Sequence, residues 1–433
     1  MAVRSEEEIE KFCDLLRHAE GYALLRNSNV ALNLSRGGDA DLLVKNFQSF
    51  TQNMLKTMGP PSMMMHRAYV DSIFWSWGHV DMLPALEWRG ARYLPNQLVW
   101  QMVRRNNYGF LEVDLVHQAV ICWFSSLIWG GFFKERYKEE ILNAVQSRQD
   151  DFQNALEYAV GSHLAQCLIE LANNGRLEDS VVFVHPLRRA LWWRAFWRSP
   201  SSTFAGWLRF WRAELELRLR PPVLWISTLG LDGSGKSSVL NELTTRLGRG
   251  QSFVGLRIKH WRPGLIAKDN STNPIVAPHE KSPRGLLASL AKLGFLLTDW
   301  IMGYWFSLVH LRAKGFLLAF DRHYMDLLVD PRRYRYGAPL WVARLVGALI
   351  PKPDLFILLD LPAEEARSRK REVPLNEARR LRQRYLDLTQ SLPNAHVVNA
   401  ARPLDEVVAE VEEIILTALQ KRTTARMCNA GLL

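Results

Sequence analysis

The sequence has 433 residues, of which 48% are hydrophobic and 23% are charged. This is the composition of an ordinary globular protein and excludes long disordered stretches. A chain of this length is too long to fold around one hydrophobic core, so we expect two or three domains. The formal charge of +11 predicts an anionic partner, such as a nucleotide, a nucleic acid or an acidic membrane face.

The four cysteines are scattered and predict reduced thiols in a cytoplasmic protein, not a disulfide framework or a zinc site. The polar N-terminus does not resemble a signal peptide. The longest apolar stretches, residues 119–133 and 293–311, fall short of an uninterrupted spanning helix, and the second contains Asp299. We expect both to be buried helices.

The first predicted domain covers residues 1–150. Asp39 and Asp41 alternate with apolar residues on a predicted strand, so both carboxylates should point to one face. Asp81 lies between apolar residues in the stretch 78–83 and would add a third carboxylate from a neighbouring strand. Carboxylates at this spacing are suited to Mg²⁺-dependent phosphoryl or nucleotidyl transfer.

This pattern resembles the nucleotidyltransferase superfamily, whose signature is a Gly-Ser turn, Asp-x-Asp on a strand and a third Asp. The resemblance covers about the first 140 residues and implies an α+β fold with metal ligands Asp39, Asp41 and Asp81. The chain departs from the signature at residues 24–28, which read Leu-Leu-Arg-Asn-Ser where the family keeps its turn. The domain is therefore interpreted either as an active nucleotidyltransferase or as a catalytically silent module for binding or regulation.

Residues 151–220 are predicted to form a helical connector. Helical periodicity covers 151–171, and Pro200 with its Ser-Ser-Thr sequence divides the later part into two helices. Tryptophan beside arginine suits a membrane interface and equally suits helices packed between domains, which is the arrangement we favour. The side chains concerned are Trp192, Trp193, Trp197, Trp207, Trp211, Arg188, Arg189, Arg194, Arg198, Arg209 and Arg212.

The second predicted domain, residues 221–425, is organised around a glycine-rich loop between an apolar run and an amphipathic helix. Glycines with this spacing let several N–H groups point at one anion. Lys236 would bring a positive charge to the terminal phosphates, and the hydroxyl of Ser237 would hold Mg²⁺. ATP and Mg²⁺ are therefore the predicted cofactors. The residues predicted to bind them are Gly230, Asp232, Gly233, Ser234, Gly235, Lys236, Ser237 and Ser238.

The remainder of this domain alternates strands with helices, which predicts a doubly wound parallel α/β sheet with its ligands at the carboxyl ends of the strands. Further strands are expected at 252–259, 315–324 and 353–360, with a helix at 286–313. Residues 266–284 are predicted to be a long surface loop, and 426–433 a tail.

The second domain is similar to the thymidylate kinase family of P-loop nucleoside-monophosphate kinases. The resemblance rests on the loop, the Arg-Pro-Gly turn at 262–264, Asp321-Arg322, the strand ending at Asp360 and the basic segment 367–371. It covers nearly the whole domain. It implies phosphoryl transfer from ATP to a nucleotide or a related phosphate or hydroxyl acceptor.

The resemblance also implies roles for single residues. Asp232 would face a sugar hydroxyl of the acceptor, Arg262 and Arg322 would bind its phosphate, and Asp321 would act near the metal. Some members carry an arginine directly after the loop aspartate, where this chain has Gly233. An arginine of the mobile lid must then stabilise the transition state. The implied catalytic residues are Lys236, Asp321, Arg322 and the lid candidates Arg367, Arg369 and Arg371.

A second departure concerns the acceptor. Thymidylate kinases follow Asp-Arg with a serine and a Tyr-Gln pair near the base, whereas this chain has a different sequence over 325–337. The thymine-binding pocket is therefore in doubt. Two interpretations stay open for Arg332, Arg333 and Arg335: a larger or more anionic acceptor, or side chains that only cover the surface.

Three hypotheses remain open from sequence. The first is the kinase described above, acting on a small phosphorylated acceptor. The second is a nucleotide-sensing signalling or defence protein whose first domain transfers nucleotides to a macromolecule. The third is a membrane-peripheral enzyme of surface-polysaccharide or lipid-linked assembly. A nucleic-acid binder ranks last because no recognised motif accompanies the charge, and a homodimer is compatible with each hypothesis.

Overall fold

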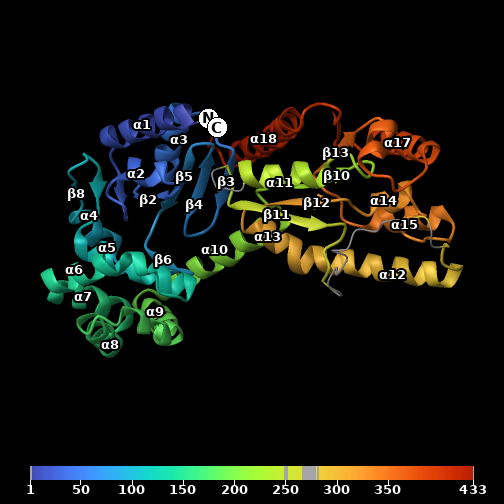
Figure 1. The fold of residues 1–433 in the computed structure, drawn as a ribbon. Coiled ribbons are helices and arrows are strands. Elements are labelled where there is room, and N and C mark those ends of the chain that lie inside the picture. The colour runs from blue at the N-terminus through green and yellow to red at the C-terminus, as the bar shows by residue number, and fades with distance from the viewer. Residues whose placement is uncertain (1, 248–251, 266–278, 280–281, 433) are drawn as a thin grey trace. The chain divides into compact units, whose positions relative to one another are not determined.

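The computed structural model describes residues 2–247, 252–265, 279 and 282–432. The chain divides into two compact units (Figure 1). The first comprises Met1–Glu216 and Thr424–Leu433, and the second comprises Leu217–Thr423. By this division, the helices of the predicted connector up to Glu216 belong to the first unit.

A mixed seven-stranded sheet forms the centre of the first unit, in the order β3-β4-β5-β2-β1-β9-β8. The pairs β2–β5 and β1–β9 are parallel, and the other neighbours are antiparallel. The strands are β1 (Tyr22–Leu24), β2 (Asp39–Val44), β3 (Met63–His66), β4 (Asp71–Trp75), β5 (Gly78–Leu83), β8 (Arg104–Arg105) and β9 (Leu111–Glu112), with a separate hairpin of β6 (Glu87–Trp88) and β7 (Ala91–Arg92). The strands predicted around the three aspartates are thus present as β2 and β5.

The helices of the first unit precede, connect and follow these strands in the chain. They are α1 (Ala2–His18), α2 (Val30–Ser35), α3 (Phe47–Met58), α4 (Asn96–Gln101), α5 (Leu115–Phe124), η1 (Ser125–Gly130), η2 (Glu135–Tyr137), α6 (Lys138–Ser147), α7 (Gln149–Val160), α8 (Ser162–Asn173), η3 (Leu177–Phe183), α9 (Val184–Arg198) and α10 (Pro200–Leu219). The prediction of one helix over 151–171 is wrong, because Gly161 with φ 90° ends α7 and α8 begins after it. The division at Pro200 is confirmed.

A hydrophobic cluster joins the helices of the first unit to residues of its strands β1 and β2. In α5 and η1 the side chains of Val120, Trp123, Phe124, Leu127 and Ile128 are completely buried. They pack with residues of α6, α7, α8 and α9 in one cluster. The expected buried helix in 119–133 is therefore confirmed over 119–128.

The second unit contains an all-parallel five-stranded sheet in the order β11-β12-β10-β13-β14. Its strands are β10 (Trp225–Leu229), β11 (Gly255–His260), β12 (Phe316–Asp321), β13 (Leu355–Asp360) and β14 (Ala395–Asn399). The predicted parallel sheet is confirmed. The edge strand β14 escaped prediction because most of its side chains are exposed, so its sequence lacks a continuous apolar run.

Helices lie on both faces of this sheet, with α11 and α18 above it in Figure 1 and α12 and α13 below it. The helices are α11 (Lys236–Leu247), α12 (Leu286–Gly303), η4 (Tyr304–Leu308), α13 (Val309–Ala313), α14 (Met325–Val329), α15 (Leu340–Leu349), α16 (Ala363–Arg369), α17 (Leu375–Gln390) and α18 (Leu404–Asn429). Most of the predicted surface loop 266–284 lies outside the described residues.

The helix Leu286–Ala313, formed by α12, η4 and α13, corrects the expectation of a buried helix at 293–311. Its most apolar window is only 33% buried, and Leu287 and Phe306 are 81% and 68% exposed. Within the described residues, it is the one helix whose length and composition would allow it to cross a membrane. Asp299 lies on its buried side with no exposed surface.

Candidate functional site

The predicted phosphate-binding loop joins the carboxyl end of β10, the central strand of the parallel sheet, to α11. Gly230, Gly233 and Gly235 have φ angles of 138°, 88° and 88°, which favour glycine. A Cβ on Gly230 would lie 2.7 Å from the carbonyl oxygen of Leu359, and one on Gly233 would lie 2.6 Å from that of Ala366. The path of the loop therefore requires glycine for both conformation and space.

Lys236 begins α11 and is almost completely buried. Its Nζ donates hydrogen bonds to the carbonyl oxygens of Gly230 at 3.0 Å and Leu231 at 2.8 Å. Burial lowers the pKa of Lys236 to about 8, and the neighbouring Arg322 adds to the shift. The ammonium group is thus held against the loop by weak neutral acceptors, for which bound phosphate oxygens would readily compete.

Ser237 and Asp321, both predicted to act at the metal, meet beside the loop. The Ser237 Oγ donates a hydrogen bond of 2.8 Å to Oδ2 of Asp321, which ends β12. The other carboxylate oxygen of Asp321 is buried and has no hydrogen-bond partner among the described residues. A hydroxyl beside a carboxylate with an uncommitted oxygen fits Mg²⁺ or one of its bound waters.

Asp232 lies in the loop and contacts two arginines. Arg322 donates to its Oδ1 and Arg333 donates to its Oδ2. Burial alone would raise the pKa of Asp232, but Arg322, Lys236 and Arg333 outweigh it and hold this pKa well below its usual value. Two residues predicted to bind different parts of an acceptor, Asp232 and Arg322, are therefore bound to each other in this structure.

Sequence reasoning missed the residues that position these arginines. Arg322 also donates to Asp326 Oδ1 at 3.3 Å, which accepts a second hydrogen bond, of 2.6 Å, from the Tyr385 hydroxyl. Arg333 donates to Glu372 Oε2 at 3.0 Å. Asp326 could have been noticed in the sequence, because it is an acidic residue within the apolar run of α14.

Arg262 is anchored to α12, not to the loop. Its Nη1 donates to Oδ2 of the buried Asp299 at 3.0 Å. The preceding Trp261 stacks on Tyr334, with ring centroids 4.7 Å apart and planes inclined by 19°. The Trp261 Nε1 and the Tyr334 hydroxyl are buried and have no hydrogen-bond partner among the described residues. This pair offers both an aromatic surface and two uncommitted polar atoms.

The basic segment predicted to be a lid, residues 367–371, comprises the end of α16 and the two residues after it. A Cβ on Gly233 would lie 3.4 Å from Cβ of Lys370, so the segment approaches the loop. Arg367, Arg369 and Arg371 are all exposed. Arg369 lies 4.0 Å from Glu365, and the other two have no ion pair within the described part of the chain.

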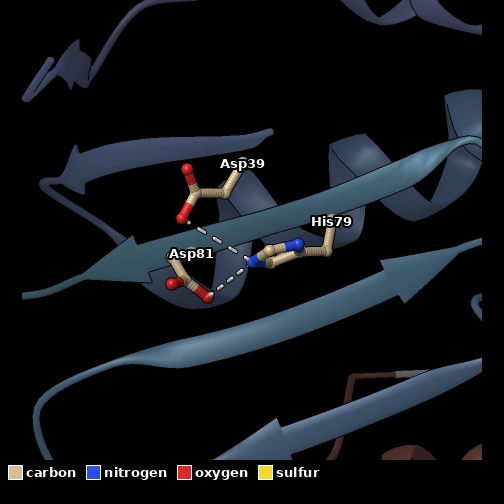
Figure 2. Close-up of side chains that lie close together, drawn as sticks. All are labelled: Asp39, His79 and Asp81. Atoms are coloured by element: carbon tan, nitrogen blue, oxygen red, sulfur yellow. Dashed lines mark ion pairs between the residues drawn. The ribbon is translucent and has the colours of Figure 1, made fainter. Parts of the chain in front are cut away.

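A second cluster of titratable side chains lies in the first unit. Figure 2 shows Asp39 from β2 converging with His79 and Asp81 from β5. His79 Nε2 is 3.9 Å from a carboxylate oxygen of Asp39 and 3.9 Å from one of Asp81. One potential ligand atom from each of the three residues lies within 4.8 Å of the others. The structure thus brings the three predicted aspartates into one neighbourhood. Of the three, Asp39 and Asp81 contribute atoms to this group of potential ligands.

Asp41, the remaining predicted ligand, is bound instead by Arg26. The Arg26 Nε donates to Asp41, and its Nη2 lies 3.2 Å from Asp39 Oδ2. Burial raises the pKa of Asp41 to about 7; Arg26 opposes this shift, and Asp39 and Asp81 add to it. Arg26 lies in the segment where the Gly-Ser turn is absent, and His79 shares a strand face with Asp81 because two positions separate them. That spacing was the signal for His79 that the sequence offered.

Comparison with known proteins identifies relatives for part of the chain. No protein-family model matches it. A thymidylate kinase of Xanthomonas oryzae pv. oryzae is 26% identical over 217 residues, covering 48% of this chain and 89% of the relative. A probable thymidylate kinase 1 of Saccharolobus solfataricus is 28% identical over 196 residues, covering 44% and 95%.

Among solved structures, thymidylate kinase from Candida albicans aligns with a TM-score of 0.35 at 19% identity, covering 46% of this chain and 93% of that one. The curated relatives are matched over most of their own length. About half of the chain is therefore a thymidylate kinase-like region.

Proposed function

We propose that the second unit is an ATP- and Mg²⁺-dependent phosphotransferase of the nucleoside-monophosphate kinase type. The observation that carries the proposal is the loop with buried Lys236 at its end and the Ser237–Asp321 pair beside it. Loop N–H groups and Lys236 bind and orient the donor phosphates. When bound, Mg²⁺ neutralises charge on the phosphates.

The acceptor in this proposal carries a phosphate. Arg322 and Arg333 both bind Asp232, and an acceptor phosphate would compete with this carboxylate for their guanidinium groups. Asp232 would then be released to accept a hydrogen bond from an acceptor hydroxyl. The Trp261–Tyr334 stack would cover an adjacent ring of the acceptor. Arg333 supplies the second cation that supports a more anionic acceptor.

The exposed lid arginines complete the proposal. Arg367 in the last turn of α16 and Arg371 just after it are without ion pairs in the described residues, and this helix approaches the loop. Their side chains can therefore turn toward the transferred phosphoryl group without first breaking an ion pair. Stabilising its equatorial oxygens is the role that Gly233 leaves unfilled.

An assay with γ-labelled ATP and a panel of nucleoside monophosphates and sugar phosphates tests the activity. We expect transfer to at least one acceptor and a loss of about a hundredfold or more in Lys236→Ala. Lys314→Ala is the matched control, because Lys314 is exposed and precedes the amino end of β12. No transfer to any acceptor, together with unchanged ATP binding in Lys236→Ala, would contradict the proposal.

A second candidate function rests on Asp39, His79 and Asp81. We propose that they hold a divalent cation for nucleotidyl transfer by the first unit. A buried oxygen of Asp81 lacks a hydrogen-bond partner among the described residues, as an uncommitted ligand should. An imidazole beside two carboxylates favours Mn²⁺ over Ca²⁺.

Calorimetric titration with Mn²⁺ tests this second candidate. Binding should weaken about tenfold or more in His79→Ala and Asp81→Asn, while Asp150→Asn, which changes an exposed carboxylate of α7, should bind as the native protein does. Transfer of labelled nucleotide to protein or RNA, lost in Asp39→Ala, would show the activity. Equal Mn²⁺ affinity in all the variants would exclude the site.

A further inference from the structure

Helix α10 is apolar on two opposite faces within the first unit. The buried face consists of Thr203, Gly206, Phe210 and Ala213. The opposite face, which we call the exposed stripe, consists of Phe204, Leu208, Trp211 and Leu215, each between 43% and 56% exposed. Both sets follow the three- and four-residue spacing that keeps side chains on one side of a helix. A helix of a water-soluble protein needs only the first face.

Close contacts within the first unit fix the direction in which the exposed stripe points. A Cβ on Gly206 would lie 2.6 Å from Cα of Gly90, in the turn between β6 and β7. The Phe210 ring lies 6.0 Å from that of Tyr69 and 6.3 Å from that of Trp129. Because these contacts hold the buried face against the unit, the exposed stripe faces away from it.

The preceding helix, α9, repeats this arrangement. Leu187, Leu191 and Ala195 are buried, whereas Trp193 and Trp197, four positions apart, are 47% and 75% exposed. Large exposed aromatic side chains on two consecutive helices are unusual for a surface that meets only water. We call these two tryptophans and the exposed stripe together the α9–α10 surface.

The positive charge of α9 and α10 indicates which kind of partner the α9–α10 surface binds. Between Asp179 and Glu214 the chain contains no acidic residue but six arginines: Arg188, Arg189, Arg194, Arg198, Arg209 and Arg212. Tryptophans sit at the headgroup level of a bilayer, and arginines bind lipid phosphates. A second copy of the chain would bring the same positive charges and be repelled.

We propose that the α9–α10 surface docks the protein onto an anionic lipid bilayer, with its apolar side chains at the headgroup boundary. The docking is peripheral, since the opposite face of α10 is packed on the first unit. It requires neither the kinase activity nor the cation site. Its failure therefore leaves both functions proposed above untouched.

Co-sedimentation of the full chain with lipid vesicles tests the proposal. Vesicles of phosphatidylcholine with phosphatidylglycerol should bind at least about tenfold more strongly than pure phosphatidylcholine. Leu208→Ser with Trp211→Ser should weaken this binding about tenfold or more. Leu98→Ser is the matched control, because Leu98 on α4 is 53% exposed and lies outside the surface. Arg189→Gln should weaken binding roughly fivefold at low salt, because Arg189 is exposed and lies four positions before Trp193 on the same face of α9.

Leu208→Lys separates insertion from simple charge attraction. The added charge would strengthen a purely electrostatic contact, whereas loss of the apolar side chain weakens a docked one, and we expect weaker binding. Since Leu208 is exposed, the melting temperature should stay that of the native protein. Absence of native binding, or equal binding by Leu208→Lys, overturns the proposal. So does a native dimer, measured by light scattering, that becomes a monomer in the Leu208→Ser, Trp211→Ser variant.

Discussion

Each unit has carboxylates at its candidate site, but the two units satisfy them differently. In the second unit Asp321 receives a hydrogen bond from Ser237 and keeps one buried oxygen uncommitted. In the first unit a guanidinium, that of Arg26, already binds Asp41 and lies 3.2 Å from Asp39. The second site is therefore suited to bind a phosphate anion together with its Mg²⁺. The first carries an internal cation and leaves only Asp39, His79 and Asp81 for an external one.

The largest expected effect follows from removing that internal cation. Arg26→Ala leaves Asp41 buried without its charge partner, which should lower the free energy of unfolding by about 3–5 kcal/mol. Because Asp39 and Asp41 then lose their bound guanidinium, Mn²⁺ should restore part of the loss. Urea unfolding with and without Mn²⁺ measures both quantities. A variant as stable as the native protein would show that Arg26 does not neutralise the cluster.

The next effect compares two glycines of the second site. Gly233 and Gly235 share a φ of 88°, but only Gly233 has a neighbouring backbone within 4 Å of an added Cβ. Gly233→Ala should therefore cost about 1–3 kcal/mol and Gly235→Ala should cost less, because it adds conformational strain alone. Thermal unfolding and ATP titration of the two variants measure the difference. Equal losses would mean that the approach to Ala366 is not tight.

The pH dependence of ATP binding comes third. The pKa of Lys236 is about 8, so its positive charge is lost as the pH rises through that value and ATP affinity should fall. The ordinary lysine pKa is about 10.4, so between pH about 8 and about 10.4 the unfolded chain keeps a proton that native Lys236 has lost. The contribution of Lys236 to the free energy of unfolding should therefore rise with pH over this range. ATP titrations across this range measure the fall. Lys236→Arg, which stays charged, should abolish it; a persisting fall would assign it to another group.

The smallest effect concerns a positioning residue. Tyr385→Phe removes the 2.6 Å hydrogen bond to the buried Asp326, whose other partner is Arg322. We expect a loss of about 1–2 kcal/mol in unfolding free energy and a KM increase for the phosphorylated acceptor, with the KM for ATP unchanged. Steady-state kinetics separates the two KM values. A change in the KM for ATP alone would contradict this role.

Much of the second site was predictable because backbone conformation is encoded locally. Glycines at 230, 233 and 235 lie between a buried strand and a helix, and the loop they predict is present. The strand ending in Asp321 was predicted for the same reason, since its side chains form a continuous apolar run. Short-range patterns of this kind need no knowledge of tertiary neighbours.

The partners of the charged residues were not predictable. Arg333 contacts Asp232 across about a hundred positions, and Arg26 contacts Asp41 from another strand's loop. Such pairs depend on side-chain placement after the sheet has formed, which periodicity does not report. The division at Gly161 and the exposed edge strand β14 were missed because their determinants, a positive φ and a solvent-facing edge, leave weak sequence patterns.

The central claim is that the Ser237–Asp321 pair serves phosphoryl transfer in the second unit. The most direct measurement is the rate of transfer from γ-labelled ATP to the best phosphorylated acceptor, with Mg²⁺, in the native protein and in Asp321→Asn. The account predicts measurable native transfer that falls about a hundredfold or more in Asp321→Asn, with the rate of Asp150→Asn unchanged. Equal rates in the native protein and Asp321→Asn would contradict it.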